Sequence, residues 1–353
     1  FPRGRIRTGN DEIGEMTSAL MGLIEGLKRT TDFSHAVAAG DFDADYKPLS
    51  EEDVLGHALL KMRAELGERE RVLEQKVRER TEEVVRQKEE VERQSRKVVE
   101  LYKNVTDSIR YAKRLQESIL PPERKIRELL PRSFVFYRPK DIVSGDFYWF
   151  ERVADRTVFA AVDCTGHGVP GAFMSLVGHN GLNQAVRESE ALHPSTILRS
   201  LNRIAFDALH KDRDQSIVRD GMDMALCVFD PDTRTLEYAG ANCPLYLVRD
   251  RDVIQYAPDK IPIGGFELHG QSFTDHRIQL QEGDVVYIFS DGYADQFGGP
   301  KGKKFLYRRF RELLVAISNE PLEAQKRALL EAFMDWKGAH EQVDDILVIG
   351  MRA

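Results

Sequence analysis

The chain has 353 residues, of which 51 are Lys or Arg and 58 are Asp or Glu, so its formal net charge is −7. This acidic balance argues against non-specific binding to nucleic acid, which requires a basic surface, and a hydrophobic share of 42% excludes disorder of the whole chain. The three cysteines form no Cys-x-x-Cys pair, which fits a reducing compartment, and no apolar run approaches the roughly 18 residues of a membrane span.

A short motif occurs twice near the N-terminus. Asp11-Glu12-Ile13-Gly14 and Asp53-Val54-Leu55-Gly56 each precede an amphipathic helix, expected over 16–27 and 58–66. Another helix is expected over 31–39, followed by a Gly- and Pro-containing connector. Helix, connector, motif and helix in this order resemble the HAMP module, a signalling unit of two helices per chain that dimerises into a parallel four-helix bundle.

The resemblance implies an all-α HAMP-like region over 1–66, in which 1–27 is half of one unit and 25–66 a complete unit. An ordinary helical hairpin is the alternative. HAMP modules usually follow a membrane helix, and the sequence begins with Phe1. The resemblance therefore implies a membrane segment before Phe1 and a place for this chain on the cytoplasmic side of the membrane.

Residues 67–120 form a linker that is rich in charge and has no Pro, which favours one long helix. Apolar residues recur every seven positions, and this repeat predicts a left-handed coiled coil of two parallel chains. Half of the seam is polar in its first stretch, because the positions three residues further on begin with Arg80, Gln87 and Gln94, so we expect a weak dimer. A single solvated helix is the alternative. The repeat is Val77, Val84, Val91, Val98, Val105, Ala112 and Ile119, and the second set is Arg80, Gln87, Gln94, Leu101, Ser108 and Leu115.

Residues 121–353 begin with the helix-ending pair Pro121-Pro122. Their sequence pattern differs from that of residues 1–120, because short β-rich runs alternate with helical stretches. Their order predicts an α+β domain with mainly antiparallel sheets. Strands are expected over 134–137, 147–153, 158–162, 224–229, 236–239, 245–248, 285–289 and 346–349, and helices over 169–187, 195–210, 303–318 and 322–337.

Acidic residues flank several of these strands at turns. Asp146 lies in Val-Ser-Gly-Asp-Phe, Asp163 in Val-Asp-Cys-Thr-Gly-His-Gly, Asp291 in Phe-Ser-Asp-Gly-Tyr, and Asp344-Asp345 precede Ile-Leu-Val-Ile. Each could be a simple turn cap. Together they predict converging carboxylates, which would repel one another unless hard cations such as Mg²⁺ or Mn²⁺ neutralise them.

The same motifs, in this order, resemble the metal-dependent PPM protein phosphatases, specifically the SpoIIE-like bacterial branch. Further matching stretches are Tyr111 to Gln116, Tyr137-Arg138-Pro139-Lys140 and Ala241 to Leu245. The resemblance covers about 100–353. It implies an α-β-β-α sandwich, in which two mainly antiparallel sheets are flanked by helices.

The resemblance also implies roles for individual residues. Asp163 would bridge two divalent ions, Mn²⁺ or Mg²⁺, and the ligand set would be completed by Asp146, Asp291, Asp344 and the backbone carbonyl of Cys164. Asp345 would support these ligands from behind. The expected nucleophile is a metal-activated water, which removes the need for a cysteine nucleophile or a phosphoenzyme.

Three side chains could assist at the phosphate. Arg138 and Lys140 are candidates for binding it, although each could be an ordinary surface charge. His167 could protonate the leaving alkoxide, or it could be a histidine held in the Gly-His-Gly turn. Gly166 and Gly168 would relax the backbone ahead of a helix whose N-terminus adds positive potential.

The leading hypothesis is a protein serine/threonine phosphatase controlled by an upstream sensor. In this branch the usual substrates are small phosphorylated STAS-domain proteins with an opposing kinase. The alternatives are a phosphatase-like scaffold without turnover and, from the HAMP and coiled-coil architecture, a cyclase or histidine kinase. The helix at 105–120 could transmit a rearrangement of the coil to the catalytic loops, or it could be a passive tether.

Overall fold

The computed structural model describes residues 12–209, 220–265 and 272–353. The chain divides into two compact units, Phe1–Leu101 and Tyr102–Ala353, and each is described by itself. Within the described ranges, no helix has the length and apolar character needed to cross a membrane.

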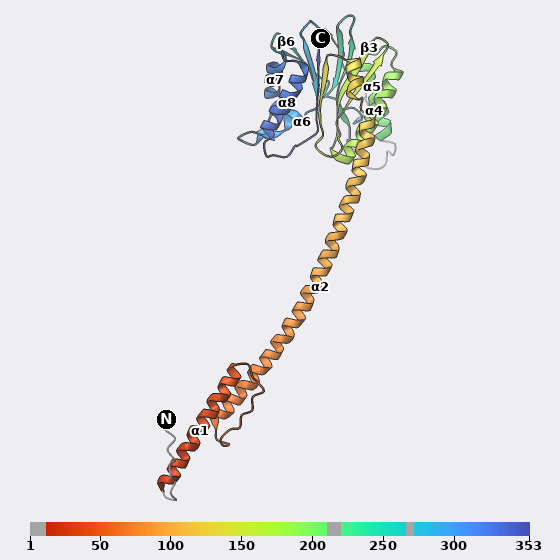
Figure 1. Ribbon diagram of the computed structural model, residues 1–353. Coiled ribbons are helices and arrows are strands. Elements are labelled where there is room, and N and C mark those ends of the chain that lie inside the picture. Colours follow the sequence, from red (N-terminus) through yellow and green to blue (C-terminus); the bar gives the residue numbers. More distant parts are fainter. Residues whose placement is uncertain (1–11, 210–219, 266–271) are drawn as a thin grey trace. The chain divides into compact units, whose positions relative to one another are not determined.

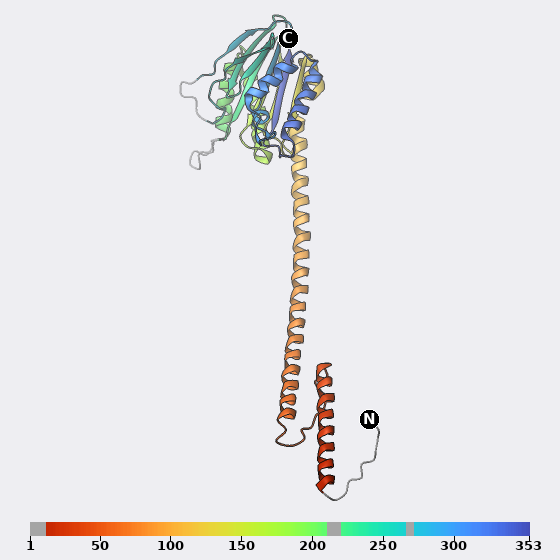
Figure 2. The same ribbon diagram turned by 90° about the vertical axis from the view of Figure 1, so that its left-hand side faces the viewer.

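The N-terminal unit consists of α1 (Glu12–Ala38), a connector and the first part of α2 (Val54–Ile119). The connector packs against both helices: the rings of Phe33 and Tyr46 stack with centroids 4.6 Å apart, and Arg63 donates to the carbonyl of Ala44 at 2.9 Å. Because the connector runs back along α1, α1 and α2 point in the same direction (Figure 2).

The helices expected at 16–27 and 31–39 are one continuous helix, so the expected break between them is wrong. Lys28, Arg29 and Thr30 contain neither Gly nor Pro, and the Thr30 hydroxyl donates back to the carbonyl of Gly26 at 3.0 Å. The helix expected from residue 58 likewise begins at Val54 and continues to Ile119. Asp53 precedes it, and one of its carboxylate oxygens accepts from Gly56 N at 2.8 Å.

The heptad stripe on α2 is exposed in the single chain. Val77, Val84, Val91 and Val98 are 58–64% exposed, although valine is usually buried. A lone helix would keep this stripe in water, whereas a second copy of the helix would bury it. The parallel dimer stays a prediction.

We expect light scattering at micromolar concentration to give the mass of a homodimer. Replacing both Val84 and Val91 by Glu should produce a monomer, because each dimer would then place four carboxylates in the apolar stripe. Arg96→Glu, on the opposite face of the helix, is the matched control and should remain dimeric. A monomeric parent protein would contradict the coiled-coil prediction.

The described residues of the C-terminal unit form two five-stranded antiparallel sheets and a small hairpin. In the first sheet the strands are, in spatial order, β1 (Ser133–Arg138), β12 (Ile346–Arg352), β9 (Val285–Phe289), β6 (Leu245–Arg249) and β7 (Asp252–Tyr256). In the second they are β2 (Phe147–Val153), β3 (Arg156–Cys164), β4 (Met222–Asp230), β5 (Thr235–Ala241) and β8 (His276–Gln279). The hairpin pairs β10 (Phe297–Gly298) with β11 (Lys303–Lys304).

Helices cover the outer faces of both sheets (Figure 1). The second sheet is covered by α4 (Gly168–Glu188) and α5 (Pro194–Leu209), and the first by α7 (Leu306–Ile317) and α8 (Leu322–Lys337). The short helices α3 (Glu123–Leu129) and α6 (Gly292–Asp295) lie in connections. One apolar core lies between the sheets and one lies under each pair of helices, which confirms the expected α-β-β-α sandwich.

All eight expected strands are present, but the sequence analysis missed the short helices α3 and α6, the hairpin strands β10 and β11, and the sheet strands β7 and β8. Both strands are short edge strands: β7 has a largely exposed face, and β8 spans only His276–Gln279. Without a continuous apolar face they lack the alternation by which a strand is recognised. Pro121-Pro122 do end α2, whose last residue is Ile119.

Candidate active site

The acidic residues selected from the sequence lie where strands of the two sheets end. Asp146 immediately precedes β2, and Asp163 is the next-to-last residue of β3. Asp291 caps the short helix α6 after β9, and Asp344 lies two residues before β12. The backbone N–H of Asp291 points to Oδ2 of Asp163 at 3.5 Å, which joins the ends of the two sheets.

The four carboxyl groups influence one another electrostatically. Burial raises the pKa of Asp146 well above its ordinary value, and the charge of Asp163 raises it further. Burial also raises the pKa of Asp163, followed by the charges of Asp291 and Asp344. For Asp291, burial and then the neighbouring carboxylates raise the pKa to about 6. The site therefore favours bound positive charge.

The donor chemistry fits a hard divalent cation. Asp146 is 2% exposed, and its Oδ2 is buried without a hydrogen-bond partner in the described part of the chain. An oxygen in this state gains a partner when a cation binds. Across the ranges that the structure describes, no three His, Cys, Asp or Glu side chains are grouped closely enough to hold a single ion.

The loop that carries Asp146 is held from two sides. Asp345, 2% exposed, accepts from Lys140 N and Gly145 N, both at 2.7 Å. On the other side, the Gln116 side chain donates to the carbonyl of Ser144 at 2.6 Å and accepts from its N–H at 3.1 Å. Asp345 thus holds this loop through two backbone N–H groups, and the last turns of α2 contact the loop directly.

Two glycines permit close approach of the backbone here. A Cβ on Gly145 would collide with the carbonyl oxygen of Gly166 and lie 3.1 Å from that of Cys164. Gly168 has φ of 65°, a conformation that favours glycine, just where α4 begins. The thiol of Cys164 is buried, and burial raises its pKa well above the ordinary value, which disfavours a reactive thiolate.

Lys140, His167 and Asp141 form a hydrogen-bonded row beside the acidic cluster. Lys140 Nζ lies 3.0 Å from His167 Nε2, and His167 Nδ1 lies 2.7 Å from Asp141 Oδ2. Because an ammonium group can only donate, Nε2 accepts and the protonated Nδ1 donates to Asp141. In this arrangement His167 positions the ammonium group of Lys140, and it must gain a proton on Nε2 before it can act as an acid.

Arg138 is engaged elsewhere. Its Nε donates to Gln342 Oε1 at 2.9 Å, and its guanidinium carbon lies 5.9 Å from the ring centroid of Phe333. Of the two candidate phosphate-binding cations, the geometry therefore favours Lys140.

Asp223 is an acidic neighbour that the sequence analysis missed. It pairs directly with Asp163 across β3 and β4, its Oδ1 accepts from Asn242 Nδ2 at 2.8 Å, and burial raises its pKa. Like charges directly opposite one another destabilise a sheet, so the pairing of Asp223 with Asp163 indicates a functional role for the acidic cluster rather than a structural one. The available signal was an Asp within the otherwise apolar start of a strand, Met222-Asp223-Met224.

The sequence of this chain is similar to that of known proteins. The model of the family "Stage II sporulation protein E (SpoIIE)" matches residues 154–353, which is more than half of the chain. The phosphoserine phosphatase RsbU of Bacillus subtilis is 24% identical over 200 residues, which cover 55% of this chain and 56% of RsbU. The chain thus spans just over half the length of this curated relative.

Solved structures agree in fold. The SiaA-PP2C domain of Pseudomonas aeruginosa is 30% identical, with a TM-score of 0.65, and the match covers 71% of this chain and 98% of that domain. The PP2C phosphatase domain of Bacillus subtilis SpoIIE, with a fragment of its regulatory domain, is 19% identical, with a TM-score of 0.51 over 63% of each chain. The chain therefore belongs to the SpoIIE family of PPM protein phosphatases, and its C-terminal unit is homologous to PP2C-type serine/threonine phosphatases.

Proposed function

We propose that this chain hydrolyses phosphoserine or phosphothreonine on a partner protein in a reaction that depends on two divalent metal ions, Mn²⁺ or Mg²⁺. The observation that carries the proposal is the convergence of Asp146, Asp163, Asp291 and Asp344 at the sheet ends, with raised pKa values for the first three. Family membership supports the same activity.

The residues that would hold the ions are these four aspartates and the carbonyl of Cys164. Bound there, the ions would supply a hydroxide-like water at neutral pH and offset the charge of the phosphoryl group. Lys140, placed by His167, would contact the phosphoryl oxygens. Once Lys140 turns to the phosphoryl group, Nε2 would take a proton from solvent water, and His167 would donate that proton to the leaving alkoxide. Asp345 and Gln116 hold the loop that places Asp146.

The proposed substrate is a small phosphorylated STAS-domain protein that an opposing kinase phosphorylates. Similarity to the phosphoserine phosphatase RsbU supports a substrate that carries phosphoserine. The parallel α1 and α2 and their connector support a HAMP-like input unit. We therefore place the chain at the cytoplasmic side of a membrane sensor, as its output part.

The test is to incubate the purified chain with a phosphorylated STAS-domain protein from the same genome. Release of phosphate should require Mn²⁺ or Mg²⁺ and should stop with EDTA. Isothermal titration of the metal-free chain with Mn²⁺ provides a readout independent of turnover. Full activity in the presence of the chelator would contradict the metal-dependent mechanism, and substrate binding without turnover in Mn²⁺ would favour the scaffold alternative.

A further inference from the structure

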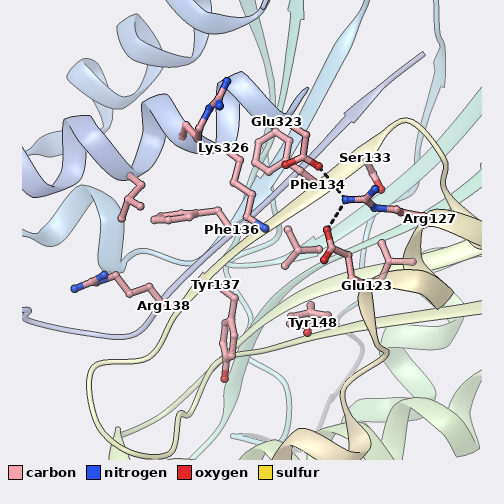
Figure 3. Close-up of a pocket in the computed structure, with 14 residues that line it drawn as sticks. Glu123, Arg127, Ser133, Phe134, Phe136, Tyr137, Arg138, Tyr148, Glu323 and Lys326 are labelled. Atoms are coloured by element: carbon pink, nitrogen blue, oxygen red, sulfur yellow. Dashed lines mark hydrogen bonds and ion pairs between the residues drawn. The ribbon is translucent and has the colours of Figure 1, made fainter. Parts of the chain in front are cut away.

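A pocket lies along the free edge of β1, and none of the acidic cluster lines it. In its sheet β1 pairs only with β12, so its other edge has no partner strand among the described residues. The pocket has a volume of about 540 Å³ and lies between this edge, α3 and α8 (Figure 3). An unpaired strand edge is a template for another extended chain.

The register shows which backbone groups face the pocket. Arg352 N donates to the carbonyl of Arg132 at 2.8 Å, so these two residues form a hydrogen-bonded pair. Because such pairs alternate along an antiparallel ladder, the even-numbered residues of β1 bond to β12 and the odd-numbered ones point their N–H and C=O groups away from it. Ser133, Val135 and Tyr137 therefore present their backbone groups to the pocket, and all three line it.

These backbone groups remain available. Within the described ranges, no hydrogen bond joins the backbone N–H or C=O of Ser133, Val135 or Tyr137 to a protein group. They recur at every second residue, about 6.6 Å apart at the usual strand rise. A strand that pairs with β1 would meet all of them, whereas a compact ligand would meet one or two.

The charges around the pocket indicate the chemistry of the occupant. Four basic side chains line it against two acidic ones, Glu123 and Glu323. Arg127 bridges both acids, at 2.7 Å and 3.2 Å, and so links α3 to α8. Lys326 reaches from α8 into the pocket (Figure 3). The remaining positive charge favours an acidic occupant, and Ile126 and Leu330 provide apolar contacts for alternate side chains.

We propose that an extended acidic segment of a partner protein docks here by adding a strand to the free edge of β1. Its backbone would pair with Ser133, Val135 and Tyr137. Its acidic side chains would lie near Lys326.

The test uses two fluorescein-labelled peptides, (Glu-Val)₄ and (Lys-Val)₄, and the full chain. We expect the acidic peptide to bind with at least tenfold higher affinity in fluorescence polarisation. Hydrogen exchange measured by mass spectrometry should slow over residues 133–138 when it binds. Equal affinity for both peptides, or protection confined to another segment, would overturn the proposal.

Two substitutions test the two parts of the contact. Val135→Pro removes a donor that faces the pocket but leaves the bonds to β12, so it should weaken binding at least tenfold; Val135→Thr is its control. Lys326→Glu should weaken binding of the acidic peptide by a similar factor, whereas Lys301→Glu, on an exposed turn, should not. If Val135→Pro fails to fold, the comparison of Lys326→Glu with Lys301→Glu still tests whether the acidic peptide binds in this pocket. Unchanged binding by Lys326→Glu would overturn the proposed acidic contact, and unchanged binding by a folded Val135→Pro would overturn strand addition. Complete displacement of the peptide by pyrophosphate would show that the pocket binds a compact anion and not a strand.

Discussion

Replacing Asp163 by Asn is expected to lower kcat by on the order of 10³-fold or more and to leave the fold intact. Asp163 is the carboxylate closest to the centre of the charge network, because the charges of Asp291, Asp344 and Asp223 all raise its pKa after burial. The amide keeps the shape of the side chain but cannot offset the charge of a cation. The measurement is turnover of the phosphorylated STAS-domain substrate at saturating Mn²⁺.

Asp155→Asn is the matched control, because Asp155 is exposed in the turn between β2 and β3 and should leave turnover unchanged. A second readout is heat stability. In EDTA, Asp163→Asn should melt at a higher temperature than the parent at pH 7, because it removes one of several mutually repelling buried charges. Mn²⁺ should stabilise the parent more than the variant. A variant that retains more than a tenth of the parent turnover would contradict the role of Asp163.

The pH dependence of the metal-free chain follows from the same charges. Burial and neighbouring carboxylates raise the pKa of Asp291 from 3.8 to about 6. The folded state therefore binds protons more tightly than the unfolded state, and stability is lost as pH rises through this range. In EDTA the melting temperature should fall between about pH 4 and pH 6, and Asp291→Asn should reduce the fall.

Much of the catalytic unit could be predicted because its strands and turns each have a recognisable local sequence pattern. The inner strands are apolar on both faces and end at Gly- and Asp-containing turns, so their positions and the placement of Asp146, Asp163 and Asp291 follow from short stretches of sequence. The edge strands β7 and β8 lack that pattern. The prediction of two helices within α1 assumed a break at residues 28–30, where the sequence contains neither Gly nor Pro.

The contacts that the sequence could not give are long-range ones. Asp223 lies opposite Asp163 only because β3 and β4 pair in one particular register. The row from Lys140 through His167 to Asp141 requires the loop before β2 to meet the start of α4. Gln116 lies 28 residues from Ser144 in the chain, and a lone Gln on a long polar helix gives no sign that its side chain is buried.

That buried glutamine leads to the second large expected effect. Gln116 is 5% exposed, and its amide donates to the carbonyl of Ser144 and to the hydroxyl of Ser175, the latter at 2.8 Å. Gln116→Leu has a similar size but would leave the N–H and C=O of Ser144 without partners, at a cost of about 1–3 kcal/mol for each buried group. The loop can avoid this cost by shifting, and Asp146 would shift with it.

We therefore expect Gln116→Leu to lower kcat and the affinity for Mn²⁺, each by roughly 10–100-fold, as is usual when a group that supports a metal ligand is lost. Glu117→Gln, on the exposed face of the same helical turn, is the control and should change neither. Titration of Mn²⁺ by calorimetry separates this effect from general destabilisation. A variant that melts earlier but keeps its Mn²⁺ affinity would show that Gln116 only stabilises the fold.

The same contact distinguishes a switch from a passive tether. Leu115, one residue before Gln116, is 50% exposed, so it is free to contact a second copy of the helix while Gln116 holds the catalytic loop. A one-residue insertion near Gln94 would rotate the preceding heptad positions by about 100° relative to Leu115. If the coil controls the loop, the insertion and Leu115→Ala should each change kcat or Mn²⁺ affinity several-fold with every proposed ligand intact, and combining either with Gln116→Leu should add little.

A four-residue insertion, which nearly restores the helical phase, should return the values toward those of the parent. Identical kcat and Mn²⁺ affinity for all insertions would mean that α2 only tethers the phosphatase unit.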